Sequence, residues 1–163
     1  MSAESTWEGP SAKDRLRILQ ESKSIAVVGA SNNKARASYF VASYLKTSSH
    51  YKVYFVNPMI DELLGDPVYK SLADLPEVPD IVDVFRKPSD TPAILEEAAK
   101  LGAKTFWLQL GISNDDLPPL AEKLGIQLVM NRCIKIEHAR FHGGLHLAGF
   151  DTGVISAKRA KAE

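Results

Sequence analysis

The sequence predicts a doubly wound α/β domain built on a five-stranded parallel sheet. Short apolar runs rich in β-branched residues alternate along the chain with longer segments of helical periodicity. Two of the helical segments are followed by glycines, Gly102 and Gly125, and an apolar run resumes after each. Glycine commonly ends a helix. Helices that connect consecutive strands form right-handed crossovers, which make the strands parallel.

The first half of the chain is expected to form two helices and two strands. Ser11 can cap the first turn of the leading helix with its hydroxyl. Asn57 and Pro58 stop the second strand, because proline has no amide hydrogen to donate within a sheet. We expect, in order, a helix over Ser11–Glu21, a strand over Ile25–Gly29, a helix over Ser38–Lys46 and a strand over Lys52–Val56.

The second half is expected to add three strands and two helices after a long connection. Asp61–Pro79 is rich in proline and acidic residues and is predicted to be a loop, with a short helix or edge pairing around Val68–Leu75. Phe106 and Trp107 are interpreted as core aromatics of the fourth strand. The expected elements are a strand over Asp80–Phe85, a helix over Thr91–Leu101, a strand over Thr105–Leu108, a helix over Asn114–Leu124 and a strand over Ile126–Met130.

The pattern divides the chain into three parts. Residues 1–23 form a helical lead-in, residues 24–141 form the α/β domain, and residues 142–163 form a tail. From Phe141 onward the chain is glycine-rich and then basic, and we assign this stretch no structure.

Composition excludes several classes of partner. The 163 residues carry no formal net charge, which argues against nucleic acid or an acidic membrane surface as the main partner. No apolar run approaches the ~18 residues of a membrane span. The polar, acidic start Met1–Glu8 is not a secretory signal. The single cysteine, Cys133, cannot form an internal disulfide, which fits a reducing cytoplasm.

The residues that follow each predicted strand are the candidate site. In a doubly wound sheet, ligands bind at the carboxyl ends of the strands. The first strand runs into a glycine turn at Gly29 and then a helix, an arrangement that binds phosphate at the helix N-terminus. We therefore expect a ligand with a diphosphate. The strand-end residues are Gly29-Ala30-Ser31, Asn57-Pro58, Arg86-Lys87-Pro88, Gln109-Leu110-Gly111 and Asn131-Arg132-Cys133.

A nicotinamide dinucleotide fits this pattern poorly. The loop from Gly29 to Lys34 has only the first of the three glycines of the dinucleotide fingerprint. Asn57-Pro58 stands where NAD sites carry a carboxylate for the ribose hydroxyls, and no arginine is present there for NADP. An NAD(P)-linked oxidoreductase remains the first alternative.

Five phrases in order resemble the small stand-alone CoA-binding proteins of bacteria and archaea. The phrases are Val28–Ser31, Val56–Pro58, Asp83–Pro88, Trp107–Gly111 and Met130–His138. The fold of that family is the Rossmann-like fold of the CoA-binding N-terminal domain of the succinyl-CoA synthetase α subunit. The resemblance implies coenzyme A, or an acyl-CoA, lying extended across the strand ends.

The resemblance also implies a role for each strand end. The diphosphate would lie at Gly29, Ala30, Ser31, Asn32, Asn33 and Lys34; Asn57 and Pro58 would border the adenosine; Phe85, Arg86 and Lys87 would flank the cofactor; and Gln109, Leu110 and Gly111 would line the pantetheine arm. Family members often carry a lysine after the Asn-Pro pair, where this chain has Met59. Either Lys34, Arg36 or Arg86 replaces it, or the affinity for phosphate is weaker.

Other charged residues have a functional and a structural interpretation. For Lys34 and Arg36, the functional interpretation is contact with a phosphate of the ligand, and the structural interpretation is an ordinary surface charge. Glu137 and His138 are interpreted as structural hydrogen-bonding groups rather than an acid–base pair, because adjacent residues point apart. His142 and His146 have the i, i+4 spacing of metal ligands, but Gly143 and Gly144 make a helix poor there, so no metal is expected.

The last strand end completes the site with Asn131, Arg132 and Cys133. A neighbouring cation favours the thiolate, so Cys133 could exchange with the disulfide of oxidised CoA, or it could simply line the site. The sequence thus predicts a binding or regulatory module without a catalytic residue, with a possible protein partner or homo-oligomer. The second alternative is a protein-interaction subunit with a vestigial pocket.

Overall fold

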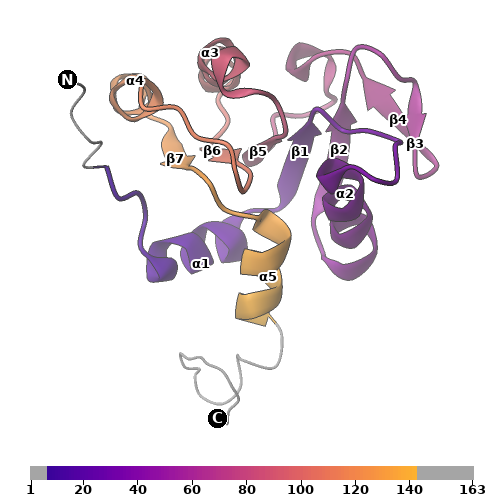
Figure 1. The fold of residues 1–163 in the computed structure, drawn as a ribbon, viewed down its shortest axis with the longest axis horizontal. Helices are drawn as coiled ribbons and strands as arrows, with labels where there is room; N and C mark the ends of the chain where they lie inside the picture. The colour runs from indigo at the N-terminus through magenta and orange to yellow at the C-terminus, as the bar shows by residue number, and fades with distance from the viewer. Residues whose placement is uncertain (1–6, 143–163) are drawn as a thin grey trace, which may run out of the picture.

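The structure, a computed structural model, describes residues 7–142 as one α/β unit (Figure 1). The helices are α1 (Ala12–Glu21), α2 (Ala37–Ser48), α3 (Thr91–Leu101), α4 (Leu117–Leu124) and α5 (Ile134–His142). The strands are β1 (Ser24–Val28), β2 (Lys52–Val56), β3 (Glu62–Leu63), β4 (Asp66–Tyr69), β5 (Ile81–Val84), β6 (Thr105–Leu108) and β7 (Gln127–Val129). Short 3-10 turns cover Leu72–Asp74 and Pro88–Asp90.

The strands form one sheet in the order β3-β4-β2-β1-β5-β6-β7. All neighbours are parallel except β3 and β4, which are antiparallel. The predicted doubly wound parallel fold is confirmed, and its five predicted strands correspond to β1, β2, β5, β6 and β7. The predicted strand count was too low, because the acidic connection contributes β3 and β4.

The extra strands form a small hairpin at one edge of the sheet. A two-residue turn at Leu64 and Gly65 joins them, and both residues have a positive φ (53° and 85°). A turn with two positive φ values matches the twist of a hairpin and usually reads Asn-Gly or Asp-Gly. Leucine is unusual at such a position, so this turn lacks the residues by which a hairpin is usually recognised.

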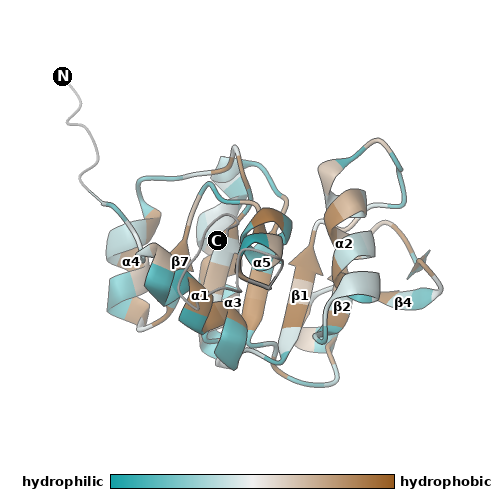
Figure 2. Cartoon of the chain, turned by 90° about the horizontal axis from the view of Figure 1, so that it is seen from below, coloured by the Kyte–Doolittle hydropathy of each residue, from teal (hydrophilic) through white to brown (hydrophobic). Residues whose placement is uncertain are grey.

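Helices cover both faces of the sheet (Figure 1). Helices α1, α2 and α5 contribute buried residues to one core, and α3 and α4 contribute to the other. Along β1, Ile25 and Val27 belong to the first core, whereas Ala26 and Val28 belong to the second. Figure 2 shows β1 as hydrophobic along most of its length, while α1 and α4 carry hydrophilic residues. A strand covered on both faces needs apolar residues throughout.

Helix ends follow the predicted signals where a side chain or glycine specifies them. The Ser11 hydroxyl accepts a hydrogen bond from the Asp14 amide at 3.1 Å and caps α1. Gly102 and Gly125 end α3 and α4 with positive φ. Phe106 and Trp107 are fully buried, as predicted. Within residues 7–142, no helix is both long and apolar enough to cross a membrane.

Helix α5 has no counterpart among the predicted elements. Two polar contacts, one buried and one partly buried, attach it to the rest of the fold. Arg15 Nε of α1 lies 2.6 Å from Glu137 Oε1, and Tyr44 Oη of α2 is hydrogen-bonded to His138 Nδ1 at 2.8 Å. These contacts confirm the structural interpretation of Glu137 and His138. They also hold the start of α5 close to the carboxyl ends of the strands.

Candidate functional site

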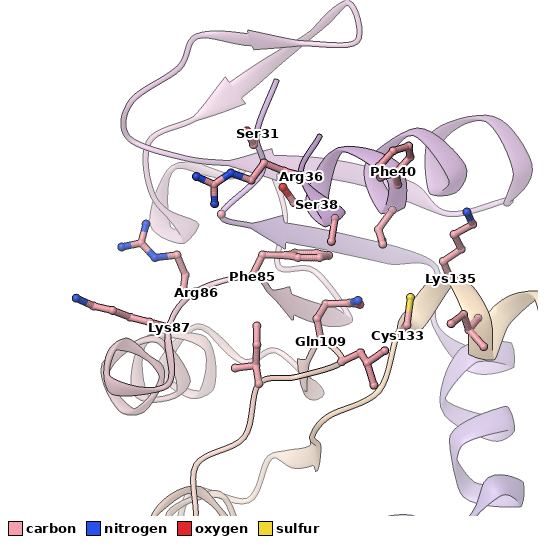
Figure 3. Close-up of a pocket in the computed structure, with 16 residues that line it drawn as sticks. Ser31, Arg36, Ser38, Phe40, Phe85, Arg86, Lys87, Gln109, Cys133 and Lys135 are labelled. Atoms are coloured by element: carbon pink, nitrogen blue, oxygen red, sulfur yellow. The ribbon is translucent and has the colours of Figure 1, made fainter. Parts of the chain in front are cut away.

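A cleft of about 670 Å³ lies at the carboxyl ends of the central strands (Figure 3). The loops after β1, β5 and β6, the first turn of α2 and the start of α5 supply its walls. Two smaller hollows of about 430 and 400 Å³ continue it, and all three share Gly29 and Arg86. The second hollow reaches Asn57, and the third reaches Pro58 and Lys70. Together they make a groove that crosses the strand ends.

Gly29 allows β1 and β5 to approach each other at the centre of this groove. Its φ is +88°, and a Cβ atom built there would lie 2.6 Å from the carbonyl oxygen of Phe85. The Gly29 amide donates to the Val56 carbonyl at 2.9 Å, so the turn is also bonded to β2. Any side chain would be strained by the backbone and would clash with β5.

The loop after Gly29 directs the start of α2 into the cleft. The Ser31 hydroxyl accepts from the Asn33 amide, and the Asn33 carboxamide oxygen accepts from the Ala35 amide, each at 3.0 Å. Ala37 and Ser38 then line the cleft in the first turn of α2. Amides in the first turn have no acceptors within their own helix, and the helix dipole is positive there. This end of the cleft is suited to an anion.

Three cations line the same part of the cleft: Arg36, Arg86 and Lys87. Figure 3 shows them at one end, with Phe85 and Gln109 between them and Cys133. The Arg86 guanidinium is paired with Asp90 Oδ2 at 3.1 Å and is partly exposed. This pair fixes the arginine at the junction of the three hollows.

Gln109 lies in the middle of the cleft, and Cys133 lies at the end opposite the three cations (Figure 3). Gln109 is buried, and its side-chain oxygen accepts from the Ile134 amide at 3.0 Å. Cys133 is half-buried and immediately precedes α5. The prediction that Cys133 lies among the cleft-lining residues therefore agrees with its position.

The predicted residues fall into two groups. Lining the cleft or its extensions are Gly29, Ser31, Arg36, Asn57, Pro58, Phe85, Arg86, Lys87, Gln109, Leu110 and Cys133. Outside the linings of these three hollows are Ala30, Asn32, Asn33, Lys34, Gly111, Asn131 and Arg132.

Several residues of the second group make structural contacts. The Ala30 carbonyl accepts from Asn57 Nδ2 at 2.7 Å, and the Arg132 carbonyl accepts from Trp107 Nε1 at 2.8 Å. Asn131 has a positive φ of 61°, and its side-chain oxygen accepts from the Gly111 amide at 2.7 Å. Ligand contact by these residues remains a prediction.

Lys70 is a site residue that the sequence analysis missed. It follows β4, which pairs in parallel with β2, and it lines the third hollow together with Pro58. Its Nζ lies 2.7 Å from Asp61 Oδ1 and donates to the Ile60 carbonyl at 3.2 Å. Lys70 thus brings a positive charge to the segment that contains Met59, where family members often carry a lysine. Only the pairing of β4 with β2 reveals this.

The other missed residues come from α2 and α5. Ser38, Phe40, Lys135 and Ile136 all line the main cleft. Phe40 and Ile136 are exposed, so neither could be recognised as a core position by periodicity. Only their position in the sequence could have indicated a role in the site. Each lies in the first two turns of a helix that begins near the end of a strand.

Asp83 is a buried carboxyl without a hydrogen-bond partner among the described residues. Burial raises its pKa well above the usual value, which favours the neutral acid. It alternates along β5 with Val82 and Val84 and is absent from the lining of the three hollows. We assign it no ligand contact.

The described part of the chain contains no cluster of three or more His, Cys, Asp or Glu side chains that could hold a metal ion. Of the two histidines considered from the sequence, His142 ends α5. Its side chain and the whole of His146 lie outside the described residues.

Three comparisons with known proteins show what this chain is similar to. An uncharacterized protein of Bacillus subtilis, YneT, is 37% identical over 132 residues, which cover 81% of this chain and 97% of that protein. A hypothetical protein from Pyrococcus horikoshii is 38% identical, with a TM-score of 0.79 over 88% of this chain and 100% of its own.

A relative with a stated activity is much longer. The ADP-forming acetate–CoA ligase of Methanocaldococcus jannaschii is 27% identical over 129 residues, which are 74% of this chain but only 18% of that ligase. The family model described as the CoA binding domain matches residues 23–139. This chain therefore belongs to the CoA binding domain family.

Proposed function

We propose that the protein binds coenzyme A, or an acyl-CoA, in the groove across the strand ends. The observation that carries the proposal is the order in which positively charged, amide and thiol side chains follow one another along the groove. Cations and the N-terminus of α2 line the first part of the cleft, Gln109 lies in the middle, and Cys133 lies at the far end. CoA has the same order, with phosphates followed by an amide-containing arm that ends in a thiol.

Each part of CoA then has a matching stretch of the groove. The diphosphate is placed at Ser31 and the first turn of α2, next to Arg36 and Arg86. The adenosine extends past Asn57 and Pro58 towards Lys70. The pantetheine arm follows Phe85 and Gln109 towards Cys133.

We further propose that the chain acts as a cytoplasmic binding or regulatory module with no catalytic role for its cleft residues. Because it matches only 18% of the length of the ligase relative, a ligase reaction would require further protein. The proposal therefore includes a protein partner, with a homo-oligomer as the alternative.

The first test compares ligands by thermal unfolding. CoA is expected to raise the melting temperature more than NAD, NADP or ATP at equal concentration, since a ligand that binds only the folded state stabilises it. At a CoA concentration of about 100 times Kd, the folded state is stabilised by about 2.7 kcal/mol. For a domain of this size, each kcal/mol raises the melting temperature by ~2–4 °C. Strong stabilisation by NADPH without any by CoA would refute the proposal.

The second test removes charge beside the proposed diphosphate. Arg86→Ala or Lys87→Ala is expected to weaken CoA binding by roughly 1–3 kcal/mol, the scale of a charge-assisted hydrogen bond. Folding stability should change little, because neither side chain is buried. Titration calorimetry measures the affinity, and Lys123→Ala on the exposed surface of α4 is the matched control. Unchanged affinity in both variants would leave the two cations as ordinary surface charges.

The third test locates the thiol end of CoA. The Cys133 thiolate is expected to attack oxidised CoA, forming a Cys133–CoA disulfide and releasing one CoA thiolate. Mass spectrometry should show one added CoA that dithiothreitol removes. Cys133→Ser should abolish the adduct while noncovalent CoA binding persists. An adduct that forms only after unfolding would contradict the placement of the thiol beside Cys133.

A further inference from the structure

Three exposed apolar side chains, Phe40, Leu110 and Ile136, line the same cleft as Cys133, and we call them the apolar rim. Phe40 is 56% exposed, Leu110 63% and Ile136 54%, and all three line the cleft. They are half of the large exposed hydrophobic residues in the described part of the chain. Ile136 lies three residues after Cys133, and such residues share one helix face. Isolated exposed hydrophobics need no explanation, but a cluster bordering one cleft indicates a binding surface.

Gln109 presents a hydrogen-bond donor to the same part of the cleft. It is only 4% exposed, and its oxygen is occupied by the Ile134 amide. Because an amide N–H can only donate, the oxygen must be the atom facing Ile134, which leaves the Nε2 group on the other side. Within residues 7–142 no acceptor takes a hydrogen bond from that group, and it is not among the buried unpaired polar atoms, so it remains accessible from the cleft that Gln109 lines. An accessible donor on the cleft wall is suited to a carbonyl oxygen of the ligand.

Positive charge is concentrated away from this apolar rim. Arg36, Arg86 and Lys87 lie at the other end of the cleft (Figure 3). Lys135 is the cation at the rim end, and its Nζ lies 5.7 Å from the centroid of the Tyr44 ring. A cation over an aromatic face is already favourably placed. The rim therefore favours an apolar group over an acidic one.

We propose that the physiological ligand is a CoA thioester whose acyl group is apolar and longer than acetyl. This inference rests on the proposed function, because it uses the same orientation of CoA. The thioester carbonyl accepts a hydrogen bond from Gln109 Nε2, and the acyl chain passes between Phe40, Leu110 and Ile136. A dicarboxylic acyl group would place its charge among these apolar side chains, which costs desolvation energy.

The experiment is a calorimetric series on the full chain with CoA and with acetyl-, butanoyl-, hexanoyl- and succinyl-CoA. Affinity is expected to rise with chain length, by up to about fourfold per methylene if each is fully buried. Hexanoyl-CoA should also bind about 2- to 12-fold more tightly than S-hexyl-CoA, a thioether that lacks the carbonyl, because one hydrogen bond is lost.

Variants of the rim test where the acyl chain lies. Phe40→Ser and Ile136→Ser are expected to remove the dependence of affinity on acyl chain length, so that the ratio of the hexanoyl-CoA affinity to the CoA affinity falls towards one in each variant. Both side chains are exposed, so folding should be preserved. Val78→Ser replaces an exposed apolar residue outside the cleft and should change none of the affinities.

The outcomes separate this inference from the proposed function. Equal affinity for CoA and every thioester would overturn the acyl site while CoA binding stands. Tighter binding of succinyl-CoA than of butanoyl-CoA would overturn the apolar acyl site, because it would mean that Lys135 binds the carboxylate of the acyl group. If the rim variants changed only the oligomeric state in sedimentation, the rim would be a protein contact and the acyl site would be wrong. Failure of CoA and all its thioesters to bind would refute the proposed function itself.

Discussion

Glu137→Ala is expected to lower the free energy of unfolding by about 3–5 kcal/mol, because it leaves a buried arginine without its partner. The Arg15 and Glu137 side chains are 7% and 5% exposed, and Arg15 Nε lies 2.6 Å from Glu137 Oε1. Arg15 also donates to the Pro10 carbonyl at 2.8 Å, so it is held in place when the carboxylate is removed. The guanidinium cannot deprotonate to relieve the cost of burial.

Urea unfolding of matched variants separates this pair from a general loss of helix stability. Glu122→Ala removes an exposed glutamate on α4 and should cost less than about 0.5 kcal/mol. The double variant Arg15→Met/Glu137→Met should recover most of the loss, because apolar side chains often replace a buried ion pair without cost. A loss below about 1 kcal/mol for Glu137→Ala would show that Arg15 reaches water.

The same ion pair has a consequence for binding. Helix α5 supplies Lys135 and Ile136 to the cleft, and Cys133 directly precedes it. The attachment of α5 to α1 through Glu137 therefore fixes three positions of the cleft wall. A variant that loosens α5 should weaken ligand binding at the Cys133 end even at temperatures where the sheet remains folded.

The strands of the sheet core could be predicted because strands buried on both faces are continuous apolar runs. Tyr54 and Phe55 in β2, or Phe106 in β6, leave little doubt about the element type. The hairpin at Leu64 could not be predicted, since its turn lacks the usual residues. Helix α5 was missed because it is short and is attached through the polar side chains of Glu137 and His138.

The candidate site was predictable to the extent that topology alone determines it. Parallel strands bring their carboxyl ends to one edge, so Gly29, Arg86 and Gln109 had to lie near one another. Lys70 depends on how an edge strand pairs, which the local sequence does not specify. Phe40 depends on how α2 is rotated, and exposed apolar residues give no periodic signal.

Gly29→Ala is expected to cost roughly 2–4 kcal/mol of stability, from a positive φ that L-residues adopt at a penalty and from a clash with β5. The added Cβ would lie 2.6 Å from the Phe85 carbonyl oxygen, which is backbone and cannot rotate away. Relief requires β1 and β5 to separate at the centre of the groove. This separation would also displace Ser31 and Arg86, which line the cleft next to Gly29 and Phe85. CoA binding should therefore be lost even at temperatures where the protein remains folded.

Gly102→Ala provides the matched control for backbone strain. Gly102 also has a positive φ, +96°, but nothing lies within 4 Å of the position its Cβ would take. It should therefore cost only the conformational penalty of about 1–2 kcal/mol and leave CoA binding intact. Chemical denaturation and calorimetry of the two variants measure the difference. If Gly29→Ala and Gly102→Ala lost the same stability and both still bound CoA, the close approach of Gly29 to Phe85 would not be the reason for a glycine at position 29. That approach would then also not determine the shape of the site.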